Sequence, residues 1–268
     1  SRKFTRENLW RAFVDMAEHH PLTQSLLYRT LKAFKYLQSP RAYLQRLVAA
    51  QFYDVPENRR GYVSADLCSR VVPPNALPGM EKVVALSRKI CSEKKHTRQF
   101  EPDNKDYLIN IFDDADLVTH KEIIDFAVSD DVLQIIVDYF GTVPRLRDLY
   151  YWVTPVNTSL QESQLFHLDR TDTKELKLFI LVEDADEGTG PTTYVAANET
   201  RRVRMSMFRR MTRIDDDVLK SCLDLTAFQS LIGPAGTAAF VDTSHCFHCG
   251  ARARTRDRHI LVYQFTTF

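Results

Sequence analysis

The sequence predicts a mainly β protein, a sandwich, barrel or jelly roll, with helices packed against one of its faces. Two changes of pattern along the 268 residues predict it. Up to about Gly141 the apolar residues recur at intervals of three and four, which is the period of helices. After Pro144 the chain consists of short segments rich in β-branched and aromatic residues, separated by turn residues, as strands are.

The helical part is expected to end near residue 145. Five segments in it have a helical apolar stripe: 9–19, 25–38, 43–53, 80–94 and 132–140. Proline- and glycine-containing breakers follow or separate these segments, such as "HHPL", "SPRAY", "VVPPNALPGM" and "FGTVPR". We expect residues 1–145 to be a mostly helical buttress.

The β part is expected to cover residues 146–268. Its predicted strands lie in the segments 149–156, 163–169, 175–184, 190–197, 236–242 and 259–268. Residues 198–231 interrupt them with a helical insertion that is rich in arginine. The sequence contains no repeat or low-complexity tract, so the expectation is a single domain over residues 1–268.

Composition narrows the class of protein. With 36 basic and 35 acidic residues the net charge is +1, which gives no reason to expect a nucleic-acid partner. An odd number of cysteines, five, fits reduced thiols better than a disulfide framework. No segment has the roughly twenty apolar residues of a membrane span. These observations predict a soluble, cytoplasmic protein.

A candidate metal site lies in the β part. In "FHLDR" the side chains of His167 and Asp169 are two residues apart and on a strand would point to the same face. A distant histidine, His248, lies 81 residues later, before the last predicted strand. Two histidines and one carboxylate form the facial triad that holds iron(II) and leaves positions open for substrate and dioxygen.

The order of motifs over residues 149–268 resembles the phytanoyl-CoA dioxygenase-like branch of the iron(II)/2-oxoglutarate oxygenases. The matching segments are "QLFHLD", "LKLFILVEDADEGTGPTTYV" and "FVDTSHCFHCGARARTRDRHILVYQF", with a looser match in the helical "EIIDFAVSDDVLQIIVDYFGTVPRL". The resemblance implies a double-stranded β-helix, that is, a cupin-like jelly roll. It also implies Fe(II), the cosubstrate 2-oxoglutarate and dioxygen, and hydroxylation of a small molecule with release of succinate and CO2.

The resemblance assigns further residues. The family's arginine at the start of the final strand maps onto Arg258, whose guanidinium would pair with the far carboxylate of 2-oxoglutarate. Asp169 is intact, unlike in the halogenating relatives. Two departures stand out: "AANE" replaces a proline-glycine-serine-histidine turn, and Gly250 replaces a serine. They concern the substrate and cosubstrate more than the metal.

Other residues are weaker candidates for the pocket. Lys177 and Phe179 share one face of a strand, so they could border the cosubstrate or the substrate. Gln164 and Trp152 lie before His167 and could line the substrate pocket. The chain as a whole is nearly neutral, so the concentration of arginines in the insertion needs a local reason. These arginines, Arg209 and Arg210 above all, would receive an anionic small-molecule substrate at the mouth of the pocket.

Two other readings stay open. One is a structural zinc site in "HCFHC", formed by Cys246, Cys249 and one or both histidines, or a cupin-like zinc enzyme without 2-oxoglutarate. The other is a jelly-roll binding module without turnover. In the iron reading the two cysteines are strand-packing thiols, and the neighbouring Arg252, Arg254 and Arg256 are solvated or form the rim.

Overall fold

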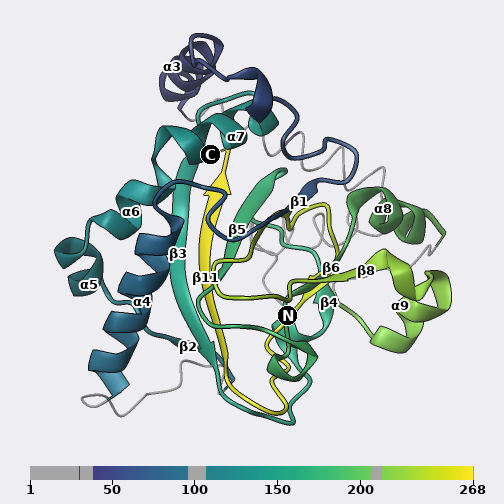
Figure 1. Cartoon of the computed structure of the whole chain (residues 1–268). Helices are drawn as coiled ribbons and strands as arrows, with labels where there is room; N and C mark the ends of the chain where they lie inside the picture. Colours follow the sequence, from purple (N-terminus) through teal and green to yellow (C-terminus); the bar gives the residue numbers. More distant parts are fainter. Residues whose placement is uncertain (1–29, 31–38, 96–106, 207–212, 268) are drawn as a thin grey trace, which may run out of the picture.

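Two antiparallel sheets face each other in the computed structural model, which describes residues 30, 39–95, 107–206 and 213–267 (Figure 1). The larger sheet has the order β1-β9-β5-β11-β3-β2 and the smaller one β7-β4-β10-β6-β8. The larger sheet consists of β1 (Ser69–Val72), β9 (Ala238–Asp242), β5 (Glu175–Leu181), β11 (Arg258–Thr266), β3 (Arg145–Thr154) and β2 (Ile109–Asn110). The smaller sheet consists of β7 (Arg213–Ile214), β4 (Phe166–His167), β10 (His248–Cys249), β6 (Thr193–Val195) and β8 (Phe228–Ser230). This is the jelly roll that the sequence predicts.

The larger sheet has an outer face under the helices and an inner face toward the smaller sheet. The Tyr263 hydroxyl on β11 donates to the carbonyl of Ile123 on α6, which places Tyr263 on the outer face. Leu178 pairs directly with Tyr263 and therefore shares this face. Because side chains alternate along a strand, Lys177 and Phe179 lie on the inner face.

Helices cover the outer face. They are α4 (Met80–Lys95), α5 (Asp114–Thr119), α6 (Glu122–Ala127) and α7 (Asp130–Phe140), with α3 (Pro40–Gln51) beyond them (Figure 1). On α7 the apolar stripe of Val132, Ile135 and Ile136 is fully buried. The helix ends at Gly141, whose φ of +67° is the left-handed conformation that favours glycine. The predicted helices at 43–53, 80–94 and 132–140 are confirmed, whereas the segment 9–19 and, apart from Thr30, the segment 25–38 lie outside the described residues.

The helical part also contributes strands that its periodicity does not predict. Strand β1 pairs with β9, and β2 pairs with β3, so both extend the larger sheet at its edges. Three-residue helical turns occur at Glu57–Arg59, Glu162–Gln164, Glu187–Thr189 and Leu225–Ala227. In the described part of the chain, no helix is long and apolar enough to cross a membrane.

The insertion is more than a helix. It contains α8 (Ala197–Ser206), the edge strand β7, α9 (Asp216–Cys222) and the edge strand β8. Strand β7 pairs with β4, and β8 pairs with β6, so both complete the smaller sheet. In Figure 1 the two helices flank the smaller sheet, on the side away from α4 and α6. Edge strands of two or three residues are held by main-chain pairing, which residue patterns do not reveal.

Candidate metal centre

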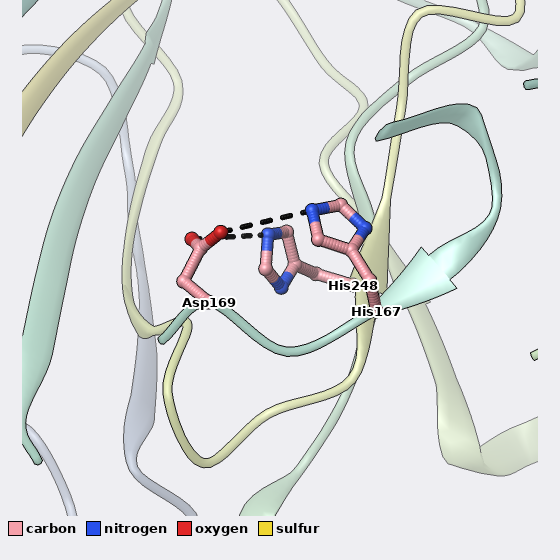
Figure 2. A group of neighbouring side chains, drawn as sticks. All are labelled: His167, Asp169 and His248. Carbon is pink, nitrogen blue, oxygen red and sulfur yellow. Dashed lines mark ion pairs between the residues drawn. The ribbon is translucent and has the colours of Figure 1, made fainter. Parts of the chain in front are cut away.

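The two candidate histidines come from neighbouring strands of the smaller sheet. Strand β10 pairs antiparallel with β4, and His248 lies directly opposite His167. Their ring centroids are therefore only 4.2 Å apart. Asp169 follows β4 and turns its carboxylate toward both rings (Figure 2). One ligand atom from each of the three residues lies within 4.8 Å of the others, so the sequence-predicted triad comes together.

Backbone carbonyls orient both imidazoles. Nδ1 of His167 is 2.8 Å from the carbonyl oxygen of Leu165, and Nδ1 of His248 is 3.1 Å from that of Cys246. A proton on Nδ1 that donates to these carbonyls leaves the lone pair of each Nε2 free for a metal ion. The two Nε2 atoms lie 3.8 and 3.4 Å from the Asp169 carboxylate oxygens. The three donors thus face a common point.

The protonation states suit a metal site. Burial, with the neighbouring His248, lowers the pKa of His167 to about 3, so this imidazole is neutral at physiological pH. Burial alone would raise the pKa of Asp169, but Lys177 and His248 hold that pKa well below its usual range. A neutral imidazole and an ionised carboxylate are the forms that bind metals.

Lys177 contacts the carboxylate of the triad. Its Nζ lies 2.6 Å from Oδ2 of Asp169 and 3.4 Å from Oε1 of Glu175. The amide of Gln264 donates to the same Glu175 oxygen at 2.8 Å. Burial opposes the charged ammonium, yet the two carboxylates raise the pKa of Lys177. The lysine, predicted from its strand face, therefore bonds to a candidate ligand; a contact with cosubstrate stays a prediction. Glu175 and Gln264 were not identified from the sequence, because no motif or spacing in it distinguishes them.

Arg258 is buried and has few hydrogen-bond partners. It is the first residue of β11, and it is 6% exposed. One guanidinium nitrogen donates to the Thr192 hydroxyl, while Nε has no hydrogen-bond partner. Burial lowers the pKa of Arg258 to about 10. No acid forms an ion pair with it within the described ranges. A buried guanidinium without an acid partner has the charge and the donors to bind a carboxylate.

Gly250 makes room for this guanidinium. A Cβ atom at position 250 would lie 3.2 Å from Nη2 of Arg258, which is tighter than ordinary contact, and 3.5 Å from its Cζ. Glycine at position 250, in place of the serine expected from the resemblance, therefore leaves space for the Arg258 side chain. The backbone N–H of Gly250 also donates a hydrogen bond to the backbone carbonyl of Ser163.

The weaker pocket candidates separate into two kinds. Phe179 and Trp152 lie on the inner face, opposite Val262 and Ile260 of β11, and Trp152 stacks on Tyr150 at 4.8 Å. Gln164 is fully buried, and its amide nitrogen donates to Asn157 Oδ1 and to the Ala251 carbonyl. Both donors of the Gln164 amide are thus used within the protein. Its predicted contact with substrate stays a prediction.

The cysteines of "HCFHC" take no part in the cluster. Among the described residues, the candidate metal cluster contains no cysteine. The His245 imidazole lies 3.0 Å from the Asp242 carboxylate and is 43% exposed. Burial raises the pKa of the Cys249 thiol to about 12, and the Cys246 thiol contacts the carbonyl of Leu67. The structure therefore favours the triad over the zinc reading, and both thiols are buried, as the iron reading predicts.

The arginines near the site differ in their surroundings. The prediction of a solvated position is wrong for Arg252, which is 20% exposed and makes a bidentate ion pair with Asp216. It is right for Arg256, which is half-exposed in a pair with Asp186. On α8, Arg201 and Arg202 are exposed. Arg209 and Arg210 lie outside the described residues.

Comparisons with known proteins support the fold. No protein-family model and no curated protein matches the sequence. EctD from S. alaskensis, solved with 2-oxoglutarate and 5-hydroxyectoine, superposes with a TM-score of 0.57 at 8% identity, covering 79% of this chain and 76% of EctD. HygX from Streptomyces hygroscopicus, solved with nickel and 2-oxoglutarate, superposes with a TM-score of 0.53 at 13% identity, covering 80% of this chain and 87% of HygX. EctD has also been solved with bound Fe. The chain thus shares its jelly-roll fold with proteins solved with 2-oxoglutarate, Fe or nickel. Within that fold it places a two-histidine, one-carboxylate triad.

Proposed function

We propose that this protein is an iron(II)- and 2-oxoglutarate-dependent dioxygenase that hydroxylates a small molecule and releases succinate and CO2. The observation that carries the proposal is the pairing of a facial triad with a buried arginine that lacks an acid partner in the described chain. The triad would hold iron(II), and the buried arginine would hold 2-oxoglutarate. The narrower resemblance to the phytanoyl-CoA dioxygenase-like branch remains part of this proposal.

The donor set fits iron(II). His167, Asp169 and His248 would supply two imidazole nitrogens and one carboxylate oxygen, the set typical of non-haem iron oxygenases. All three donors come from one side, from β4, the turn after it, and β10. The other coordination positions would stay open for exogenous ligands. Lys177 keeps the Asp169 carboxylate ionised and holds one of its oxygens in place.

The charges in the site fit a dicarboxylate. Asp169, Glu175 and Lys177 together carry at most one net negative charge, so a divalent metal ion and Arg258 would still leave a positive excess. A buried positive excess is costly unless an anion compensates it. The dianion 2-oxoglutarate does so: Arg258 would hold its far carboxylate, with the Thr192 hydroxyl beside it. Lys177 and Phe179 would border the same inner space.

Iron(II), 2-oxoglutarate and dioxygen would supply the oxidising chemistry, as cofactors do in such enzymes. The chain's own residues bind, orient and exclude water. Phe179, Val262 and Ile260 form a buried apolar wall on the inner face, which keeps the site dry. Trp152 is partly exposed on the same face and would contact substrate.

We also propose that the substrate is anionic, because Arg201 and Arg202 of α8, beside the smaller sheet, are exposed, and because Arg209 and Arg210 follow them in the sequence. Replacing Arg209 and Arg210 by glutamine should raise the Michaelis constant of a found substrate and flatten its salt dependence. Kinetics equal to those of the parent at every salt concentration would remove the anionic substrate from the proposal.

The experiment that tests the function measures three things on the purified protein. Anaerobic addition of Fe(II) and then 2-oxoglutarate should produce the visible absorption of their chelate, and admission of dioxygen should yield succinate. The matched variants are Arg258→Met, which should lose the 2-oxoglutarate step, and Arg256→Met in the loop just before β11, which should keep it. Metal binding without 2-oxoglutarate binding would favour a cupin-like metal enzyme. Binding of both without succinate, with candidate substrates present, would favour a binding module.

A further inference from the structure

The insertion contacts both strands that bear the candidate histidines. Strand β4 is only two residues long and lies between β10 and the insertion's β7, so that His167 pairs with His248 on one side and with Arg213 on the other. At the second strand, the Thr200 hydroxyl of α8 accepts from the N–H of Phe247 at 3.0 Å, one residue before His248. The insertion therefore supports the main chain at both histidines.

Arg252 closes this arrangement from the other end. Its guanidinium makes two bonds, of 2.6 and 2.8 Å, to the carboxylate of Asp216, the first residue of α9. Its Nε donates to the Gln164 carbonyl at 2.5 Å, and the guanidinium lies 5.6 Å over the ring of Phe166. Gln164 and Phe166 precede His167 by three residues and one residue, and Arg252 follows His248 by four. One side chain thus joins the insertion, the approach to β4 and the loop after β10.

The surroundings make this contact stronger than a surface ion pair. The side chains of Arg252 and Asp216 are 20% and 26% exposed, and the bidentate geometry fixes the angle as well as the distance. Ile214 and Phe166 belong to one buried cluster beneath the pair, together with Leu219 of α9. A shift of α9 would therefore be transmitted to β4, which has only two paired residues with which to resist it.

We propose that Arg252 is a positioning residue, which sets the relative position of His167 and His248 by tying the insertion and β4 to the loop after β10. The inference rests on the proposed metal site. It assigns the insertion a part in holding the metal ligands, in addition to any contact with substrate. Arg252 itself touches neither histidine in the described contacts, so its effect would pass through the backbone of β4 and β10.

The test uses Co(II) as the probe, because its visible absorption reports both affinity and ligand geometry. The variants are Arg252→Lys, which keeps the charge and loses the fork, and Asp216→Asn, which keeps the shape. Each should raise the Kd for Co(II) about tenfold and change the shape of the absorption bands, as substitutions around metal ligands do. Combined, they should cost less than the sum of the two single effects, because both remove the Arg252–Asp216 ion pair. The control is Arg256→Lys, since Arg256 lies in the same loop and pairs with an exposed aspartate at the same 2.8 Å; its Kd should stay within about twofold of the parent.

The outcomes separate the two levels of the argument. A parent protein that binds no Co(II) would overturn the proposed function and this inference with it. A parent that binds Co(II), with Kd and spectrum unchanged in Arg252→Lys and Asp216→Asn, would overturn the coupling alone. Thermal unfolding of each metal-free variant checks that a loss of Co(II) binding is not caused by a loss of folding. If Arg252→Lys does not fold, Asp216→Asn decides, and an unchanged spectrum there would likewise refute the coupling.

Discussion

Replacing Arg258 by methionine should stabilise the protein without cosubstrate while abolishing 2-oxoglutarate binding. The structure supplies the magnitude of the first effect. Burial lowers the pKa of Arg258 from 12.5 to about 10, and at about 1.4 kcal/mol per pKa unit this corresponds to a cost on the order of 3 kcal/mol for the charged group. Methionine has similar length and no charge, so much of this cost should disappear. Loss of the hydrogen bond to Thr192 would offset about 1 kcal/mol of this stabilisation.

The second effect has the opposite sign. A bidentate, buried guanidinium–carboxylate contact loses about 2–5 kcal/mol when the arginine is truncated, which raises the Kd for 2-oxoglutarate about 30-fold or more. Urea unfolding of the metal-free protein measures the first effect, and titration at fixed Fe(II) without dioxygen measures the second. Arg256→Met is the control for both, because Arg256 is half-exposed. An Arg258→Met variant that is less stable than the parent, or that binds 2-oxoglutarate equally well, would refute the reasoning.

Three further predictions concern the metal, the glycine beside Arg258 and acid stability. Alanine at any one ligand should abolish Fe(II) binding and leave the circular dichroism spectrum intact, whereas His245→Ala should bind as the parent does; the ligands are His167, Asp169 and His248. Gly250→Ala places a Cβ 3.2 Å from the guanidinium, so the Michaelis constant for 2-oxoglutarate should rise several-fold while the metal Kd stays constant; an unchanged Michaelis constant would contradict this account of Gly250. Burial would raise the pKa of Asp242, but bonds from His245, Ser244 and Tyr139 lower it. A lowered pKa contributes stability that is full above the unfolded-state value of about 4 and is lost as the pH falls through the folded-state value. Asp242→Asn should therefore cost about 1–3 kcal/mol at pH 7 and flatten the dependence of unfolding free energy on pH below 4; parallel curves for the two proteins would speak against it.

The local patterns of the sequence determined much of the framework. Apolar spacing located α4 and α7, and β-branched runs located β3, β5, β9 and β11, because a helix or strand with one buried face repeats that face in its sequence. The same alternation placed Lys177 and Phe179 on one face, and the inner position of both follows from the pairing with β11. The three residues of the triad were also within reach: the spacing of His167 and Asp169 grouped them on an expected strand, although Asp169 lies in the turn after β4, and the family resemblance singled out His248.

Only the tertiary structure decided which distant groups meet. The strands β4, β7 and β10 have two residues each, too few for any periodicity, and they exist because each finds a partner main chain. Arg252 reads in the sequence as one of several alternating loop arginines, yet it bonds to Asp216, 36 residues away. Arg258 meets Thr192 across 66 residues, over a glycine whose missing side chain gives it room. Such contacts depend on the closure of the whole jelly roll, which brings chemically ordinary residues together without leaving a local pattern of spacing.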